Sequence, residues 1–214
     1  MIRIAIIDDH PVTRKGLATM IALERDMEVC GEAENIGQAL KLIQETSPDL
    51  AIIDVSLKSG NGIDLVARLR EQECSVRMLV CSMYEESLYA DRALRAGAMG
   101  YINKDASTET IVAAIRRIMT GKVYLSPEMS ERMLHRMVLG KTGVQESPLE
   151  SLSDRELETF QWMGHGLTTS QIADQMCLSP KTVETYRARI KDKLGVDSMP
   201  ELTRRAAQWV IENG

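Results

Sequence analysis

Apolar residues follow two different spacings along the first half of the chain. Short continuous apolar runs are typical of strands buried in a parallel sheet, and stretches with apolar residues three or four positions apart are typical of amphipathic helices. Strands are predicted at residues 2–7, 28–33, 50–54, 77–82 and 99–102. Helices are predicted at residues 12–23, 36–44, 63–70 and 85–96, with a last helix that has Ile111, Ile115 and Ile118 on its core face. This alternation predicts an α/β fold, a doubly wound five-stranded parallel sheet with right-handed crossovers.

A stretch rich in glycine, serine and proline divides the chain in two. It covers residues 140–151 and is the best candidate for a linker. Before it, Ser126-Pro127 is a helix-start signal and predicts a helix over residues 127–139. The expected organisation is a first domain at 1–121, a linker with a helix at 122–151 and an all-α second domain at 152–214.

The second domain begins with a helix-capping signal. Ser153 and Glu156 have the spacing of a capping box, so a helix is predicted to begin there and to end at Gly164 or Gly166. The following helices are predicted at residues 169–176, from Ser179-Pro180 and from Pro200, where Ser198 and Glu201 repeat the capping spacing. Because the second and third helices are joined by so short a turn, the pattern predicts a helix-turn-helix.

Charge is distributed unevenly over this acidic chain. The formal net charge of −5 argues against a protein that coats nucleic acid indiscriminately. Between residues 181 and 193, however, five cations stand against two acids, which predicts a focused contact surface on the third helix. The five cations are Lys181, Arg187, Arg189, Lys191 and Lys193.

Several other classes of protein are disfavoured by composition. The four cysteines have no C-x-x-C spacing and Cys81 lies inside an apolar strand, so we expect reduced thiols and neither disulfides nor a cysteine metal site. The three histidines are scattered, and no histidine metal centre is expected. Since no apolar run is long enough to span a bilayer and the chain starts directly with a strand, we expect a soluble cytoplasmic protein with no membrane partner.

Polar side chains stand at the ends of four predicted strands. Asp8 and Asp9 follow the first strand, Asp54 ends the third, Ser82 ends the fourth, and Lys104 follows the fifth. Because the carboxyl ends of parallel strands meet at one edge of a sheet, we expect these side chains to converge there. Each acid taken singly is as readily a solvated turn or a helix cap, so it is the joint pattern that indicates a site.

The charges at this edge indicate its chemistry. Three clustered carboxylates repel one another, and Mg²⁺, which prefers oxygen ligands, is their natural neutraliser. A carboxylate placed there can act as a nucleophile toward phosphorus and form an aspartyl phosphate. Lys104 would then balance the added phosphoryl charge, and Ser82 would donate a hydrogen bond to one of the phosphoryl oxygens.

Residues 1–121 resemble the receiver domain of two-component systems, which has a flavodoxin-like or CheY-like fold. The motif Ile7-Asp8-Asp9-His10, the lone Asp54, Ser82 and the run Gly-Tyr-Ile-Asn-Lys-Asp at residues 100–105 match that domain in order and spacing. The resemblance implies that Asp54 accepts a phosphoryl group from the histidine of a sensor kinase. One position departs from the common pattern, because Asp105 stands where many receivers have proline.

The resemblance also implies a metal site and a switch. Asp9 and Asp54 would bind Mg²⁺ directly, Asp8 would act through a water molecule, and the carbonyl of Ser56 would complete the protein ligands. Ser82 and Tyr101 would form the switch pair, which changes conformation when Asp54 is phosphorylated. Phosphorylation would then favour a homodimer.

The third helix of the second domain has one apolar and one polar face. Val183, Ile190 and Leu194 share the apolar face. The opposite face carries Glu184, Thr185, Ala188, Arg189 and Asp192. Small or hydrogen-bonding side chains flanked by cations are typical of a helix that enters the major groove of DNA. Many such helices are merely solvated, so periodicity alone leaves both interpretations open.

Residues from Leu152 to about Trp209 resemble the LuxR-type helix-turn-helix. The matching motifs are Leu-Ser-x-Arg-Glu at 152–156, Gly-Leu-Thr at 166–168 with Ile172-Ala173, and Leu-Ser-Pro-Lys-Thr-Val at 178–183. Together the two halves resemble a NarL/FixJ-type response regulator over nearly the whole chain. The resemblance implies binding to double-stranded DNA, with base contacts from Lys181, Glu184, Thr185 and Ala188 and backbone contacts from Thr182, Arg189 and Lys191.

The leading prediction is a phosphorylation-dependent transcription regulator that is not an enzyme. One alternative is a phosphotransferase or phosphatase with an aspartyl nucleophile, but Asp8-Asp9 is not the D-x-D motif of such hydrolases. Another alternative is a receiver used only as a non-phosphorylated dimerisation scaffold. The intact set of acids argues against it.

Overall fold

The computed structural model describes residues 1–58, 60–139 and 148–213. The chain forms two compact units, Met1–Met133 and Leu134–Gly214, and each is considered by itself. The linker predicted at residues 140–151 lies mostly outside the described residues. Its last part forms a short 3-10 helix, η1 (Pro148–Ser151).

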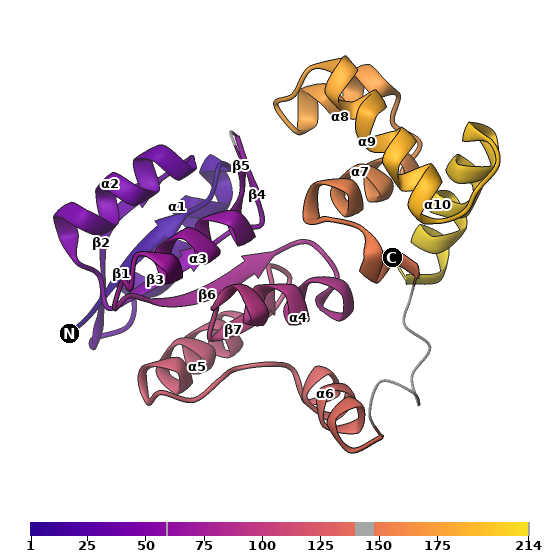
Figure 1. The fold of residues 1–214 in the computed structure, drawn as a ribbon. Helices are drawn as coiled ribbons and strands as arrows, with labels where there is room; N and C mark the ends of the chain where they lie inside the picture. The colour runs from indigo at the N-terminus through magenta and orange to yellow at the C-terminus, as the bar shows by residue number, and fades with distance from the viewer. Residues whose placement is uncertain (59, 140–147, 214) are drawn as a thin grey trace. The chain divides into compact units, whose positions relative to one another are not determined.

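A five-stranded parallel sheet forms the centre of the first unit (Figure 1). Its strands are β1 (Ile2–Ile7), β2 (Met27–Ala33), β3 (Leu50–Ile53), β6 (Arg77–Ser82) and β7 (Gly100–Asn103). They lie in the order β2-β1-β3-β6-β7, and every neighbouring pair is parallel. All four residues of β3 are buried, as expected for a central strand with a continuous apolar run. The predicted doubly wound sheet is therefore confirmed.

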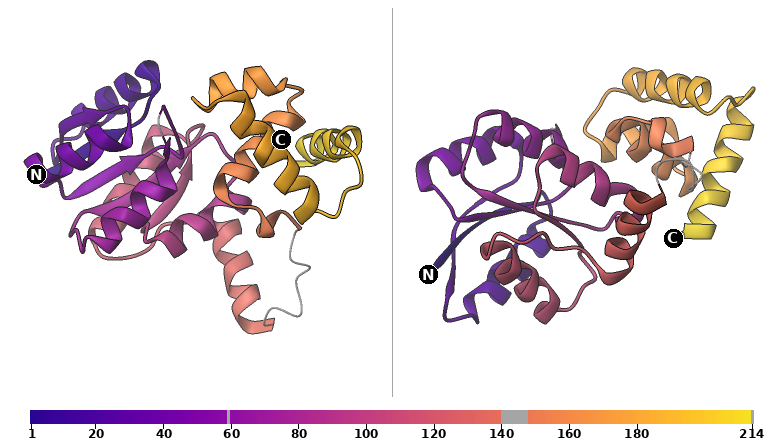
Figure 2. Two further views of the ribbon diagram at one scale, coloured as in Figure 1. Left: turned by 45° about the horizontal axis from the view of Figure 1, so that its top comes forward. Right: turned by 60° about the horizontal axis from the view of Figure 1, so that its bottom comes forward.

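Helices cover both faces of this sheet (Figures 1 and 2). On one face, α1 (Pro11–Ala22) and α5 (Thr108–Met119) pack their apolar residues into one buried cluster with strand residues such as Ile4 and Ile52. On the other face, α3 contacts both α2 and α4. These three helices are α2 (Ile36–Thr46), α3 (Gly62–Glu71) and α4 (Glu86–Ala96). Because both faces are covered, the strands can be apolar throughout.

The observed bounds of these elements differ from the predicted ones by at most two residues, and β1 and β6 have the predicted bounds. A hairpin of two very short strands, β4 (Ser56–Leu57) and β5 (Gly60–Asn61), is absent from the prediction. Strands of two residues have no periodicity that could reveal them. The hairpin leads from the end of β3 to α3, and Asn61 caps α3 by accepting a hydrogen bond from the amide of Ile63 at 2.8 Å.

The segment that follows α5 returns to the edge of the sheet at β7. The amide of Tyr124 donates to the carbonyl of Met99 at 2.9 Å, and the carbonyl of Tyr124 accepts from the amide of Tyr101 at 3.3 Å. Shortly afterwards the hydroxyl of Ser126 caps α6 (Pro127–Leu139). The helix-start signal therefore predicted α6 correctly.

Four helices make up most of the second unit. They are α7 (Asp154–Gly164), α8 (Thr169–Gln175), α9 (Pro180–Lys193) and α10 (Met199–Asn213). Helix α7 contacts α9 and α10, and α8 contacts α9 across the short turn of the predicted helix-turn-helix. Leu157, Ile172, Val183 and Leu202, one from each helix, are buried in the core of this unit.

The capping box predicted at the start of α7 is confirmed and also anchors α9. The amide of Ser153 donates to Glu156 Oε2 at 2.7 Å, and the amide of Glu156 donates to the Ser153 hydroxyl at 3.4 Å. Lys193 Nζ lies 2.6 Å from the same Glu156 oxygen. Burial raises the pKa of Glu156, but the hydrogen bonds from Lys193 and Ser153 outweigh burial and hold this pKa below its usual value.

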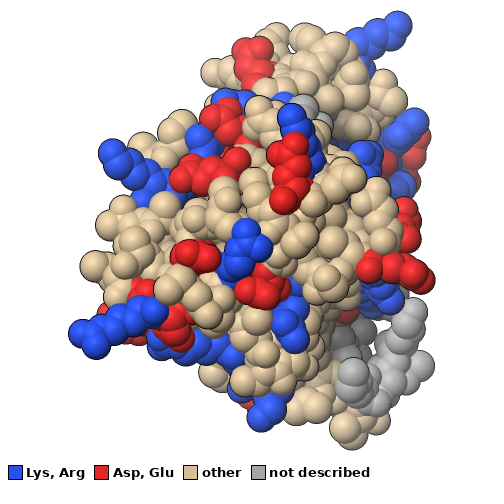
Figure 3. Space-filling model, turned by 90° about the vertical axis from the view of Figure 1, so that its left-hand side faces the viewer, with Lys and Arg blue, Asp and Glu red and all other residues tan. Residues whose placement is uncertain are grey.

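Basic and acidic side chains are mixed on the molecular face shown in Figure 3, where blue and red residues lie next to one another. Ion pairs on the first unit include Arg116 with Glu24 at 2.7 Å and with Asp26 at 2.9 Å. Among the helices of the described ranges, none is both long enough and apolar enough to cross a membrane.

The close packing at Gly62 gives a test of the fold around Asp54. A Cβ atom at Gly62 would lie 1.9 Å from the backbone oxygen of Asp54, so Gly62→Ala must displace the backbone at the end of β3. We expect Gly62→Ala to lower the free energy of unfolding by roughly 1–3 kcal/mol, measured by hydrogen exchange of the β1 and β3 amides. The control is Gly16→Ala, where a Cβ atom would meet nothing within 4 Å. Because Gly16 lies in the interior of α1, this control should raise the free energy of unfolding by about 0.5–1 kcal/mol. Equal exchange in the two variants would contradict the close approach.

The capping box gives a second test, in the second unit. Both tryptophans of the chain, Trp162 and Trp209, lie in this unit, so tryptophan fluorescence during urea denaturation reports its unfolding alone. We expect Ser153→Ala to lower the free energy of unfolding by about 1 kcal/mol, because the amide of Glu156 loses its partner. Ser170→Ala, at an exposed position inside α8, should raise it by at most about 0.5 kcal/mol. A cap that contributes nothing would leave Ser153→Ala at the wild-type midpoint.

Candidate functional site

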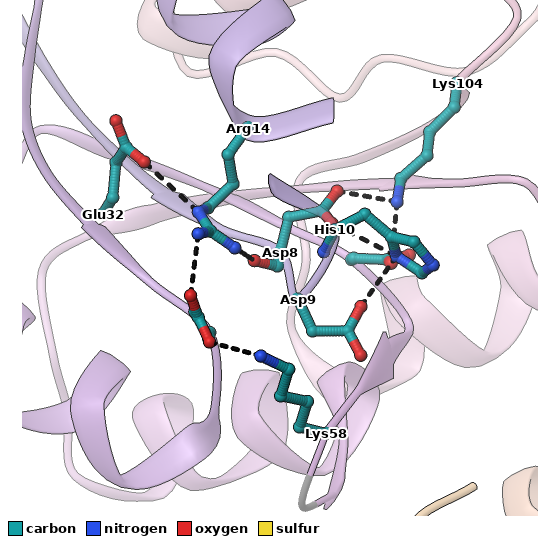
Figure 4. A network of polar contacts seen from close by, with 9 residues as sticks. Asp8, Asp9, His10, Arg14, Glu32, Lys58 and Lys104 are labelled. Atoms are coloured by element: carbon teal, nitrogen blue, oxygen red, sulfur yellow. Dashed lines mark hydrogen bonds and ion pairs between the residues drawn. The ribbon is translucent and has the colours of Figure 1, made fainter. Parts of the chain in front are cut away.

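Three charged residues from the ends of three strands meet at one edge of the sheet (Figure 4). Asp8 follows β1, Asp54 follows β3, and Lys104 follows β7. Lys104 Nζ lies 2.6 Å from Asp8 Oδ2 and 2.7 Å from Asp54 Oδ2. The side chains of both aspartates are 3% exposed and that of Lys104 is 8% exposed. The strand ends therefore bring these three residues together, as their sequence positions indicate.

Asp9 and His10 complete the acidic side of this cluster. His10 Nδ1 lies 2.7 Å from Asp9 Oδ1, and the His10 amide donates to Asp8 Oδ1 at 2.7 Å. The potential ligand atoms of Asp8, Asp9, His10 and Asp54 all lie within 4.8 Å of one another. Sequence reasoning gave His10 no role, because its imidazole contacts Asp9 only when the turn after β1 is formed. Three carboxylates this close offer the oxygen ligands that a hard divalent cation requires.

Burial and neighbouring charges have opposing effects on the pKa values of this cluster. Burial raises the pKa of Asp54, and Asp8 raises it further, although Lys104 acts in the other direction. The pKa of Asp9 is also raised, chiefly by burial. For Lys104, burial lowers the pKa, but Asp54 and Asp8 outweigh burial and the net shift is upward. Lys104 therefore stays protonated and pairs with both Asp8 and Asp54.

Ser82 and Tyr101 lie beside Asp54, and both are buried, at 1% and 0% exposed. A hydrogen bond from Ser82 helps to lower the pKa of Asp54, and Ser82 is also a hydrogen-bond partner of Tyr101. The Tyr101 hydroxyl donates to the carbonyl of Tyr84 at 2.7 Å. Burial raises the pKa of Tyr101 well above its usual value, so this hydroxyl is a neutral donor. Tyr101 thus points inward and links β7 to the loop after β6.

The loops around the cluster contain the two other residues singled out from the sequence. Ser56 is half-buried at the start of β4, two positions after Asp54. On the opposite side, the amide of Asp105 donates to Asn103 Oδ1 at 2.8 Å. Proline has no amide hydrogen for this contact, so aspartate at this position permits an Asx turn after β7.

A second group of charges adjoins the acidic cluster (Figure 4). Arg14 of α1 donates to the backbone oxygen of Asp8 at 2.6 Å, to Glu34 at 2.8 Å and to Glu32 at 3.2 Å. The other oxygen of Glu34 lies 2.6 Å from Lys58 Nζ, between β4 and β5. Sequence reasoning missed this group because its members lie on separate elements, and no spacing rule connects them.

Helix α9 presents the polar face predicted for it. The exposed residues of this face are Lys181, Glu184, Thr185, Ala188, Arg189 and Asp192. Thr182 and Lys191 are half-buried, and Val183 and Ile190 are buried on the opposite side. The residues proposed for base contacts are therefore all exposed to solvent.

Two of the five cations counted on α9 have partners within the second unit. Arg187 donates to the hydroxyl of Thr169 at the start of α8, and Lys193 pairs with Glu156. Both help to fix the helices to one another. The cations that remain on the outward side and its margin are Lys181, Arg189 and Lys191.

Comparison with known families divides the chain in a similar way. Residues 4–116 match the response regulator receiver domain, and residues 150–206 match the bacterial regulatory proteins of the luxR family. The chain belongs to the response regulators. Its receiver domain is followed by a LuxR-type helix-turn-helix, and proteins of this kind are DNA-binding transcription regulators and not enzymes. The aspartyl-nucleophile enzyme considered from the sequence is thereby excluded.

Individual relatives resemble this response regulator over nearly its whole length. The response regulator GacA of Pseudomonas aeruginosa is 33% identical over 208 residues, covering 97% of this chain and 96% of GacA. The virulence transcription regulator BvgA of Bordetella pertussis is 36% identical over 203 residues, covering 94% of each protein. Among solved structures, the response regulator ChrA of a heme-sensing two-component system is 30% identical with a TM-score of 0.53, covering 97% of both chains.

Proposed function

We propose that Asp54 accepts a phosphoryl group from the histidine of a sensor kinase, and that this modification controls DNA binding by α9 in the cytoplasm. The observation that carries the proposal is the contact of Lys104 with both Asp8 and Asp54 at 2.6 and 2.7 Å. This contact leaves a buried carboxylate at a strand end beside the cation that a transferred phosphoryl group needs. We propose the domain bounds 1–121 and 152–214, with a linker at 122–151.

The acidic cluster fits a Mg²⁺ ion. Three carboxylates and one lysine leave two negative charges, and the carboxylate oxygens are close enough to share one ion. Asp9 and Asp54 would bind it directly, Asp8 through a water molecule, and Ser56 through its carbonyl. When bound, the ion would supply positive charge to the oxygens of the incoming phosphoryl group.

The residues around Asp54 have distinct roles in the proposed transfer. An oxygen of Asp54 forms the new P–O bond while the P–N bond of the phosphohistidine breaks and its electron pair returns to the imidazole. Lys104 balances the charge of the transferred group, and the Ser82 hydroxyl donates to one of its oxygens.

Ser82 and Tyr101 are the proposed switch pair. In the structure, the Tyr101 hydroxyl has Ser82 and the carbonyl of Tyr84 as its partners. When Ser82 turns toward a phosphoryl oxygen, Tyr101 keeps only the contact to Tyr84, which alters the surface around the ends of β6 and β7. We propose that this change favours a homodimer, in which two copies of α9 on one duplex gain affinity through effective concentration.

The proposed DNA surface is the outward face of α9. Lys181, Glu184, Thr185 and Ala188 would meet base edges, and Thr182, Arg189 and Lys191 would meet the phosphate backbone. The support for this assignment is that all the base-contact residues are exposed while Arg187 and Lys193 have partners inside the unit. Glu184 and Ala188 are not cations, so the DNA sequence that is read should reflect those two side chains.

Phosphorylation by a small phosphodonor with Mg²⁺ tests the acceptor. We expect Asp54→Asn to abolish labelling, measured by intact-protein mass spectrometry. Asp9→Ala should slow labelling at limiting Mg²⁺ by at least about tenfold. Mutating residues that only hydrogen-bond to metal ligands already lowers metal affinity or activity about tenfold or more, and Asp9 is a proposed direct ligand. Asp174→Asn, at an exposed position on α8, removes a carboxylate remote from the cluster and should label normally. Labelling of Asp54→Asn at the wild-type rate would refute the acceptor assignment.

Salt titrations of DNA binding test the assignment of α9. Lys191→Ala and Arg189→Ala should each flatten the dependence of log K on log salt by about 0.9, since each phosphate contact releases one counterion. Glu184→Ala and Thr185→Ala should instead change which bases are preferred, by roughly 1–3 kcal/mol for a good contact. Lys193→Ala removes a cation that pairs with Glu156 and should leave the salt slope unchanged. Identical effects from the four outward variants would show that the face is misassigned.

A further inference from the structure

The charged group beside the acidic cluster has one rigid and one adaptable member. The side chain of Arg14 is 11% exposed and is fixed by the backbone oxygen of Asp8, Glu32 and Glu34. The side chain of Lys58 is 52% exposed, and its ammonium group lies 2.6 Å from Glu34. Arg14 therefore fixes Glu34, and Glu34 in turn holds Lys58.

Lys58 lies on the Asp9 side of the cluster, and Lys104 lies on the other side (Figure 4). Burial is the main influence on the pKa of Asp9 and raises it, whereas the charge of Lys58 is among those that lower it. Lys58 thus lies beside a proposed metal ligand (Figure 4). Lys104, in contrast, is fully engaged by Asp8 and Asp54 and is almost buried. Of these two lysines, Lys58 is the one that an approaching solute can meet.

The group of four charges is neutral as a whole. The charges of Arg14 and Lys58 balance those of Glu32 and Glu34. Neutralising Glu34 therefore leaves the group with a net charge of one positive unit. Neutralising Lys58 leaves it with a net charge of one negative unit. An exposed ion pair contributes little to stability, and a lysine on its flexible stem can change partners readily. The Lys58 ammonium can therefore turn from Glu34 toward an anion that approaches the acidic cluster.

We propose that Lys58, held beside the acidic cluster by Glu34, determines the preference for phosphodonors by favouring those with greater negative charge. This inference rests on the proposed phosphorylation of Asp54. A phosphodonor must approach three carboxylates, and a cation beside Asp9 weakens the repulsion in proportion to the charge of the donor. Glu34 sets how much of the Lys58 charge the donor experiences.

A purely structural role for the Glu34–Lys58 pair makes a different prediction. If the pair only clips the β4–β5 hairpin to the end of β2, Lys58→Gln and Glu34→Gln break the same contact and must change phosphorylation in the same direction. If Lys58 acts through its charge, the two variants shift the local charge by one unit in opposite directions. Their rates must then move apart, and the double variant must return toward the wild-type rate.

The experiment uses the full chain with saturating Mg²⁺ and subsaturating donor, and measures the initial rate of Asp54 labelling. With acetyl phosphate, a dianion, we expect Lys58→Gln to be about two- to fourfold slower and Glu34→Gln about two- to fourfold faster than wild type. Phosphoramidate carries one negative charge fewer, so both effects should shrink to about the square root of those factors. All differences should disappear near 1 M salt, where the screening length is about 3 Å.

A surface ion pair on α2 provides matched controls. Lys41 and Glu45 lie 3.8 Å apart and are both well exposed, so Lys41→Gln and Glu45→Gln should leave both donors unaffected. Shifts of the same sign in Lys58→Gln and Glu34→Gln, or differences that persist in high salt, would overturn the charge role. If Asp54 is labelled normally and Lys58→Gln has the wild-type rate with both donors, the inference about Lys58 is overturned while the proposed function stands. Failure of both donors to label Asp54 in the wild-type chain would overturn the proposed function and the inference together.

Discussion

The buried ammonium of Lys104 is what allows Asp8 and Asp54 to lie side by side as carboxylates inside the first unit. Lys104 follows the edge strand β7, whereas Asp54 follows β3 and Asp8 follows β1, which lie two and three positions from β7 in the sheet. Neighbouring strands are about 4.8 Å apart, so the lysine and the two aspartate side chains must together bridge two to three strand spacings. The long cationic side chain of Lys104 makes this possible, and its ammonium group contacts both carboxylates. The strand order, the length of the lysine and the burial of the acids therefore depend on one another.

Hydrogen bonds and ion pairs within each unit decide which charges remain available to other molecules. On α9, Arg187 and Lys193 contact Thr169 and Glu156, while Arg189 remains exposed. A count of cations along the sequence treats all of them as equivalent. Contacts across helices show that some of the cations that mark α9 as basic in fact hold the helix-turn-helix together.

Most of the fold was predictable because its elements obey local rules. The continuous apolar runs of β1 and β3, the cap at Ser153 and the break before Pro180 each depend on residues close together in sequence. The acidic cluster was also predictable, since strand ends converge whatever their side-chain details. The contact of Lys58 with Glu34 was not, because it joins residues 24 positions apart on two loops. The β4–β5 hairpin that presents Lys58 is likewise too short to have a pattern.

The hydrogen bonds between Tyr124 and the backbone of β7 have a consequence for how the receiver can be isolated. Met99 and Tyr101 use one edge of the β7 segment to pair with Tyr124, and this segment is the last of the sheet. A fragment cut at residue 121 would lack this partner and would expose unpaired amide and carbonyl groups along an apolar strand. Such an edge is a template for pairing between chains. Self-association of that fragment would then reflect where the chain was cut, and a receiver that extends past Tyr124 would keep its sheet closed on this side.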